Sequence, residues 1–361
     1  SVHRGLGLSA LGYSINVLEP ILTLLIVRVT NASIWGLFLL AESIGYAACR
    51  VASLGLERGM LWDIARSRDG EHYVIRGLPG ALVIGGAFGI CVASCVQPFM
   101  PWLVGSYFGE PEALGAALII LWTTPITVLV SILIFSAQGL QDVLPRMAVG
   151  QVTVPIITRG LPLVLLVLGG SDSPAHELIA YGHLAGTSAG LCVAFVLLKR
   201  RMSQVNARLE QDAFWPSARV IKYSIPSGIA ELLSTLMVRI DVWMLAALMD
   251  AAAVGLYGIL LSLSKALRTL RHVITPVVTP IMSEATRDGQ SARITGAFAQ
   301  STFLVTWISM PIMVTLWTFA IPLLTLYGPE FTEGYWPLLV LCGGTLIHVI
   351  AGLANTIVAG A

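Results

Sequence analysis

Charged residues inside long apolar segments are the part of this sequence best suited to chemistry. The stretch MVRIDVWML, residues 237–245, places Arg239 and Asp241 two positions apart in an apolar segment that runs from about Ile225 to Leu248. A charge at the centre of a bilayer costs about 2.5–3.5 kcal/mol on insertion scales, so such residues usually face a water-filled pathway. Arg239 and Asp241 are about 200° apart around a helix, so we do not expect them to pair with each other.

Basic residues outnumber acidic ones at this depth. Four acids share it: Glu19, Glu42, Glu231 and Asp241. Seven basic residues lie at the same depth: Arg28, Arg50, Arg159, Arg239, Lys265, Arg268 and Arg271. Long basic side chains near a helix end can reach the membrane surface, which is an alternative explanation for Arg28 and Arg271 but not for Arg239 or Lys265. The excess of bases favours a polar cavity that binds an anionic ligand, and we predict that the seven bases line it.

A cationic stripe is predicted on the helix expected at 252–273 and the residues that follow it. Four polar residues recur there at positions i, i+4, i+7 and i+11, which share one helix face: Ser264, Arg268, Arg271 and Thr275. Lys265 and His272 lie beside them. Structural ion pairs with Asp241 or Glu231 are one explanation of the stripe, and an anionic ligand is the other.

Two of the acids are candidates for ion coupling. Glu19 precedes Pro20, and a proline inside a span frees a backbone carbonyl and permits a bend. We predict that Glu19 or Asp241 couples transport to protons, with a structural hydrogen-bonding role as the alternative. No nucleotide-binding motif occurs, so energy must come from an ion gradient or from the substrate gradient. We expect no catalytic residue, no cofactor and no metal site, and we expect the five cysteines to pack as small apolar residues.

The elements that must position these residues are membrane-spanning helices. Of the 361 residues, 56% are hydrophobic and only 11% are charged, against about 25% charged in soluble domains. A span needs about 20 apolar residues, and lipid admits only helices or closed barrels. No barrel-type alternation is present, so an all-α fold is predicted. Ten spans are expected, at roughly 9–29, 35–56, 78–104, 114–137, 147–168, 177–198, 223–248, 252–273, 295–327 and 336–358.

The loops between these spans predict the orientation of the chain. One set of alternating segments, with the N-terminus, carries 14 lysines and arginines, and the opposite loops carry none. Basic loops stay in the cytoplasm, so the N-terminus is predicted to be cytoplasmic. The basic residues are spread over several loops, so nucleic acid is not an expected partner. The 295–327 segment is longer than one span needs, so part of it should lie beyond the bilayer or bend at Pro311 and Pro322.

The sequence also contains a weak internal repeat. WGLFLLAES at 35–43 resembles VGLYGILLS at 254–262, and PWLVGSYFGEPE at 101–112 resembles PLLTLYGPEFTE at 322–333, at spacings of 219 and 221 residues. Spans one to four would then correspond to spans seven to ten as parallel repeats with a substrate path between them. We predict an N-terminal six-helix lobe at 1–198, a cytoplasmic linker at 199–222 and the first four helices of a second lobe at 223–361. On this basis we expect the natural protein to continue for two more spans.

Three stretches resemble a known family. Residues 224–267, SIPSGIAELLSTLMVRIDVWMLAALMDAAAVGLYGILLSLSKAL, and 274–285, ITPVVTPIMSEA, look like the C-terminal lobe of polysaccharide (O-antigen) flippases. Residues 35–67, WGLFLLAESIGYAACRVASLGLERGMLWDIARS, resemble their second span. These flippases belong to the multidrug/oligosaccharidyl-lipid/polysaccharide exporter superfamily. The resemblance implies two six-helix lobes around a cavity that opens alternately to each side, in the bacterial inner membrane. It implies an undecaprenyl-diphosphate-linked oligosaccharide as substrate, as in lipopolysaccharide synthesis, with cationic residues holding the diphosphate.

Two other functions remain open. A multidrug exporter of the same superfamily would favour organic cations, which suit an acidic cavity better than a basic one. A membrane glycosyltransferase or polymerase would need a larger outward domain with catalytic acids than these short loops provide. The expected partners are the lipid-linked substrate, membrane lipid and proteins of polysaccharide assembly such as a polymerase.

Overall fold

The structure is a computed structural model that describes residues 18–69, 72–168, 174–210, 213–265, 267 and 291–360. By its internal contacts the chain divides into two units, Ser1–Gly255 and Leu256–Ala361. The described residues are almost entirely helical, which confirms the predicted all-α class.

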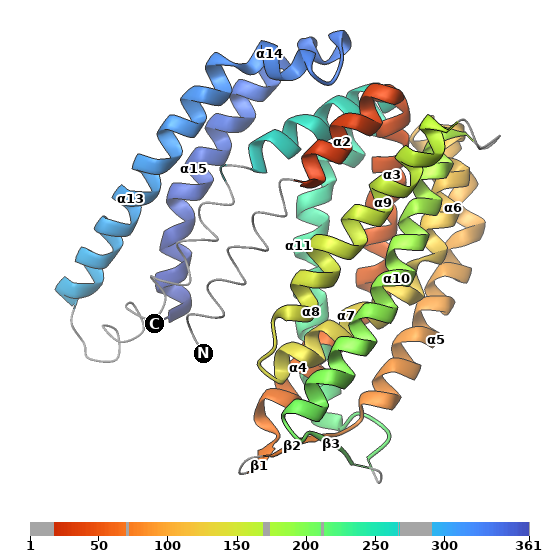
Figure 1. Ribbon diagram of the computed structural model, residues 1–361, viewed down its shortest axis with the longest axis vertical. Coiled ribbons are helices and arrows are strands. Elements are labelled where there is room, and N and C mark those ends of the chain that lie inside the picture. The colour runs from red at the N-terminus through yellow and green to blue at the C-terminus, as the bar shows by residue number, and fades with distance from the viewer. Residues whose placement is uncertain are drawn as a thin grey trace. The chain divides into compact units, whose positions relative to one another are not determined.

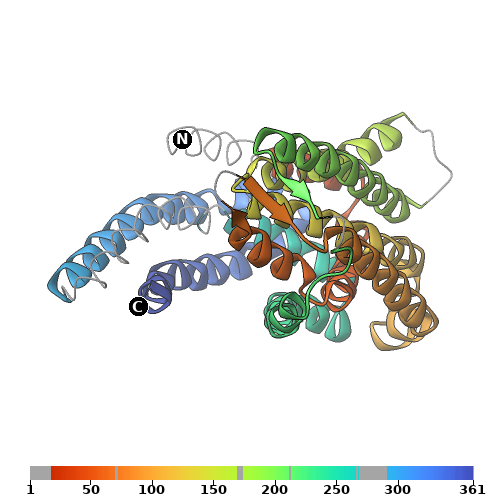
Figure 2. The same cartoon turned by 90° about the horizontal axis from the view of Figure 1, so that it is seen from below.

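Helices of the first unit form a bundle, and α3 (Ala32–Ser53) is at its centre. It packs against α5, α6, α7, α10 and α11 (Figures 1 and 2). The other helices of this unit within the described residues are α2 (Leu18–Val29), α4 (Leu56–Arg66), α5 (Leu78–Val96), α6 (Leu114–Trp122), α7 (Thr124–Gly139), α8 (Leu144–Met147), α9 (Val154–Val167), α10 (Ala175–Gln204) and α11 (Ala218–Leu248). Short 3-10 or π turns extend some of them: η1 (Gln97–Phe99), η2 (Pro101–Tyr107), η3 (Pro111–Ala113) and η4 (Ala148–Thr153).

The ends of α3 follow from its sequence. Asn31 caps the start, because its Oδ1 accepts a hydrogen bond from the Ile34 N–H at 2.8 Å. The helix ends at Ser53 because Leu54 and Gly55 adopt left-handed backbone conformations, with φ of 50° and 71°. A Cβ at Gly55 would lie 2.2 Å from the Ser224 carbonyl oxygen, so the close approach of α11 at this turn requires glycine.

Three very short strands join the loops at one end of this bundle (Figure 2). The strands are β1 (Arg68–Asp69), β2 (His72–Ile75) and β3 (Arg208–Leu209). β2 pairs antiparallel with β1 and parallel with β3, with Val74 opposite Arg208. An ion pair between Arg76 and Glu210 lies beside this pairing. The predicted linker segment at 199–222 therefore includes a strand that holds it against the loop after α4.

One predicted span is broken. We expected a single helix over 114–137, but α6 and α7 meet at Thr123 with a bend of 41°. Pro125 has no N–H to donate to the preceding turn, and the Thr123 hydroxyl donates to the Ile120 carbonyl at 2.6 Å. The bend is therefore a consequence of the proline in the first turn of α7.

Helices of the second unit include residues 256–265 of the helix Ala251–Lys265, and α13 (Ser291–Thr318), α14 (Ala320–Thr325), η5 (Pro329–Gly334) and α15 (Tyr335–Gly360). A bend at Pro311 and Pro322, or a part beyond the bilayer, was predicted for the 295–327 segment. α13 continues through Pro311, and the helix is interrupted at Phe319, before Pro322. The interruption lies between two helices that remain packed against each other.

The helices have the length and surface of membrane spans. Within the described residues, five are long and apolar enough to cross a bilayer, or six when the bent pair α6–α7 is one span. α11 also spans 31 residues, although it carries charges at Glu231, Arg239 and Asp241. Large apolar side chains point outward from the bundle, such as Val83, Val164 and Phe195. An apolar exterior is what a lipid-facing surface requires.

Candidate functional site at the α3–α11 interface

Helices α3 and α11 pack antiparallel and bring several intramembrane polar residues together. Trp243 Nε1 donates a hydrogen bond to Ser43 Oγ at 2.8 Å. One turn along, the Arg239 guanidinium carbon lies 4.6 Å from the centre of the Tyr46 ring, which is a cation–π contact. Arg239 therefore reaches the neighbouring helix and does not depend on Asp241, whose Oδ1 accepts from the Val242 N–H at 2.9 Å.

Four charged side chains form a cluster at the far end of the same interface. Arg50 lies 3.4 Å from the Glu57 carboxylate and 3.7 Å from that of Glu231. Arg58 also pairs with Glu231. Glu57 is almost fully buried, and Ser53 Oγ lies 3.3 Å from its Oε1. The cluster has two positive and two negative charges, so Arg50 is neutralised here by carboxylates.

A second ion pair joins α2 and α9. Arg159 Nη2 donates to Glu19 Oε1 at 2.9 Å, and Arg159 Nε donates to Thr23 Oγ1 at 3.0 Å. The Arg159 side chain is only 12% exposed, and it also lies 6.0 Å from the Trp35 ring centre. Two predicted site residues with different proposed roles, a ligand-binding base and a coupling acid, are therefore partners in this structure.

The remaining predicted bases take no part in the Arg239 contact, the Arg50 cluster or the Arg159–Glu19 pair. Arg28 is exposed in the last turn of α2, and Lys265 is exposed at the end of its described helix in the second unit. Ser264 is buried, and its hydroxyl donates to the Leu261 carbonyl at 2.9 Å. Arg268 and Arg271, with most of the predicted stripe, lie outside the described residues.

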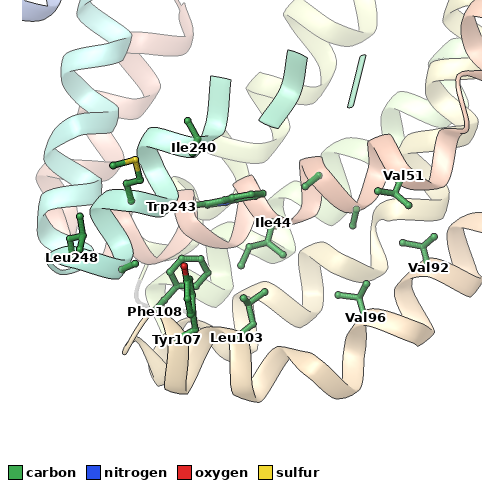
Figure 3. Close-up of a pocket in the computed structure, with 14 residues that line it drawn as sticks. Ile44, Val51, Val92, Val96, Leu103, Tyr107, Phe108, Ile240, Trp243 and Leu248 are labelled. Atoms are coloured by element: carbon green, nitrogen blue, oxygen red, sulfur yellow. The ribbon is translucent and has the colours of Figure 1, made fainter. Parts of the chain in front are cut away.

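An apolar pocket of about 650 Å³ borders the same interface (Figure 3). Ile44 and Val51 of α3 line it together with Ile240 and Trp243 of α11, and Figure 3 shows Ile44 beside the Trp243 ring and Val51 further along α3, near Val92. The other walls come from α5 and the turn that follows it, including Val92, Val96, Leu103, Tyr107 and Phe108. α3 therefore has an apolar face on this pocket and carries Tyr46 and Arg50 on other faces.

Sequence reasoning missed several polar residues of the bundle. Tyr46 and Trp243 were not singled out, because aromatic residues are common in any span. His183 was not considered either, although it is buried in α10. A signal existed for Tyr46, since it lies four residues after Glu42, one of the four acids noted at membrane depth, and shares its helix face.

Comparisons with known proteins agree with this architecture. A family model described as "Polysaccharide biosynthesis protein" matches residues 83–334. Among solved structures, an inward-facing multidrug-resistance MATE family transporter of the MOP superfamily superposes with a TM-score of 0.63 at 15% identity, covering 96% of this chain and 85% of that chain. A MOP superfamily transporter from Pyrococcus furiosus, described by the reverse polarity of its binding pocket, gives 0.57 at 16%, covering 97% and 81%. No curated protein matches the sequence.

Proposed function

Because the chain belongs to the polysaccharide biosynthesis protein family and has the fold of MOP superfamily transporters, we propose that it is a flippase for lipid-linked oligosaccharides. The family and the fold are those of a transporter and not of an enzyme. The proposed substrate is an oligosaccharide on undecaprenyl diphosphate, such as an O-antigen or lipopolysaccharide precursor. It would move by alternating access across the bacterial inner membrane.

Arg239 is the observation that carries the choice of an anionic substrate. It lies at membrane depth, is partly buried, and stacks on Tyr46. Within the described part of the chain, no carboxylate lies at ion-pair distance from it. A guanidinium that stacks through its face keeps the N–H groups at its edge available, and these suit a phosphate oxygen. Arg50 and Arg159, by contrast, would bind a phosphate only after their carboxylate pairs open.

Matching helix caps support the two-repeat architecture of the proposal. Asn31 Oδ1 accepts from the Ile34 N–H, and Asp250 Oδ1 accepts from the Ala253 N–H, both at 2.8 Å. The two caps are 219 residues apart, which is the spacing of the sequence repeat that begins at Trp35. Both repeats therefore begin their second helix in the same way. We propose ten spans in this chain, arranged as two parallel repeats with cytoplasmic basic loops.

Transport in reconstituted vesicles tests the proposal. Wild-type protein should move a fluorescent undecaprenyl-diphosphate oligosaccharide between leaflets, while a fluorescent organic cation should not be moved. Charge-assisted hydrogen bonds contribute about 1.5–3 kcal/mol. Arg239→Gln should therefore lower the apparent affinity roughly 10- to 100-fold, and Arg239→Lys should retain part of it.

Arg219→Gln is the matched control, because Arg219 is an exposed base in the first turn of the same helix. It should transport like the wild type. Transport of the organic cation without the oligosaccharide would replace the flippase with a multidrug exporter. Equal activity of Arg239→Gln and Arg219→Gln would remove Arg239 from the substrate site.

A further inference from the structure

A small polar cavity lies inside the first unit and shares Tyr46 with the α3–α11 site described above. Its volume is about 170 Å³, and helices α3, α6, α7, α9 and α10, with the π turn η4, surround it. Eight of its lining residues can hydrogen-bond or change charge: Glu42, Tyr46, Cys49, Thr123, Thr124, Thr127, His183 and Thr187. A cavity of this size and polarity can hold water molecules or a small ligand.

Three side chains in this cavity are not satisfied by the protein. Within the described residues, the Glu42 carboxylate and the His183 imidazole have no hydrogen-bond or ion-pair partner, and His183 is only 8% exposed. The Thr124 hydroxyl is buried without a partner as well. The hydroxyls of Thr123, Thr127 and Thr187 instead donate to backbone carbonyls. Leaving a buried hydroxyl such as that of Thr124 unpaired costs about 1–3 kcal/mol, and the half-buried Glu42 carboxylate faces the same cavity without a protein partner, so these groups indicate a ligand that the cavity receives.

Charged groups on several helices interact electrostatically with Glu42, His183 and the neighbouring Tyr46. Glu42 and His183 interact electrostatically with each other, and His183 also interacts with Arg159 of α9. Tyr46 and Cys49 share the α3 wall of the cavity with Glu42. Arg239 of α11 and Glu19 of α2 interact electrostatically with the Tyr46 hydroxyl. The described lining residues of α6 and α7 include three threonines and no charged residue. One carboxylate and one imidazole are therefore the charge-changing groups that face each other here.

We propose that Glu42 and His183 form a proton-binding site that couples proton movement to transport. One proton binds to a carboxylate oxygen of Glu42 or to a ring nitrogen of His183, and it is released again when the site is exposed to the other side. A carboxylate beside an imidazole suits a proton because histidine changes charge between about pH 5 and pH 8. A divalent metal cation would instead be expected among several charged or imidazole ligands, and no group of three or more His, Cys, Asp or Glu residues gathers in the part of the chain that the structure describes.

The cavity wall reaches the surface at η4. Val149 and Gly150 of this π turn line it, and Gly150 is exposed. A Cβ at Gly150 would meet no atom within 4 Å, so the space around this residue is open. π turns inside helices are frequent at functional sites. This turn would admit water, and hence protons, to the pair.

Infrared difference spectroscopy of purified protein in nanodiscs tests the site without any substrate. As the pH is lowered, one component of the protonated carboxylic acid band should grow in the wild type and be lost in Glu42→Gln, while the components from the other carboxyls remain. Glu112→Gln removes an exposed loop carboxylate and should leave that band in place. His183→Gln should change the pH dependence of the component lost in Glu42→Gln, since it removes a neighbouring group that can carry charge. An unchanged band in Glu42→Gln would overturn the proposal, and so would a band that sodium suppresses at fixed pH.

The coupling part rests on the proposed function, so it needs a second measurement. In vesicles, an imposed pH gradient should accelerate oligosaccharide movement by the wild type but not by Glu42→Gln. Acceleration of both proteins alike would overturn coupling through this site. Should no oligosaccharide move at all, the flippase proposal fails while the spectroscopic result still decides the proton site. Glu42→Asp keeps a carboxylate and replaces Glu42→Gln as the test if the glutamine variant does not fold. The aspartate variant must still show a titrating carboxylic acid band.

Discussion

Gly36 and Gly255 lie face to face where α3 crosses the helix that begins at Ala251. A Cβ on Gly36 would lie 1.7 Å from the Ala251 carbonyl oxygen, and a Cβ on Gly255 would lie 1.9 Å from that of Ala32. Both pairs of equivalent residues are 219 positions apart. Gly36 of the first repeat thus meets Ala251 of the second, and Gly255 of the second repeat meets Ala32 of the first. Such a reciprocal pair of contacts is the pattern expected across a two-fold axis. This reciprocal contact between equivalent positions supports the repeat that was found in the sequence.

Alanine at Gly36 should destabilise the protein. The new methyl group meets a backbone oxygen that cannot rotate away, so the two helices must separate. Overpacking of this kind costs about 1–3 kcal/mol, and thermal unfolding in detergent should show a lower Tm. Gly160→Ala is the control, because a Cβ there meets no atom within 4 Å and alanine favours the helix. Equal Tm values for the two variants would show that the crossing is looser than described.

Glu231 should couple energetically to Arg58. Replacing Glu231 with glutamine removes the negative charge that both Arg50 and Arg58 contact. Because these side chains are 25–42% exposed, we expect each pair to contribute at most about 1 kcal/mol. A double-mutant cycle with Glu231→Gln and Arg58→Gln should give a coupling free energy of unfolding of about 0.5–1 kcal/mol. Strictly additive effects would mean that the pair does not stabilise the fold.

Local sequence patterns predicted the helices well because each span is encoded by its own residues. The span expected at 35–56 is α3, Ala32–Ser53, so its bounds were predicted to within three residues. The apolar length of each segment and the lipid environment are enough to specify a helix without knowledge of its neighbours.

Partners of the charged residues could not be predicted, because they lie far apart in sequence. Arg58 and Glu231 are 173 residues apart, and Arg159 and Glu19 are 140 residues apart. Counting bases against acids suggested an anion site, but it could not tell which bases already have carboxylate partners. Arg239 differs from Arg159 only in what the fold places beside it, an aromatic ring in one case and a carboxylate in the other.

Asp63 on the amphipathic helix α4 should make stability depend on pH. Burial raises the pKa of the Asp63 carboxyl above its ordinary value, and Arg76 partly opposes this shift. A raised pKa in the folded protein means that its charged form is disfavoured, so stability is full below the ordinary value of about 3.9 and is lost as the pH rises from there through the raised pKa of the folded state. Asp63→Asn should therefore raise Tm at pH 7 by more than at pH 4. The same gain at both pH values would contradict this, and Glu112→Gln serves as an exposed control.

Arg159 can be tested as a structural residue against its predicted role in ligand binding. Arg159→Met removes the guanidinium partner of Glu19 and of the Thr23 hydroxyl at a site where Arg159 is only 12% exposed. Removing one member of a fully buried pair costs about 3–5 kcal/mol, and the 29% exposure of Glu19 should reduce this to about 2 kcal/mol.

A second substitution separates the two roles. Glu19→Leu with Arg159→Met replaces the ion pair by apolar side chains, which is often neutral for stability, so Tm should recover toward the wild-type value. If Arg159 only holds α2 against α9, this double variant should also recover oligosaccharide transport in vesicles. If Arg159 binds the diphosphate, or if Glu19 carries the coupled proton, the double variant should be stable and inactive. Glu19→Gln with Arg159 intact then distinguishes these last two cases, because it keeps the base and removes the titrating acid.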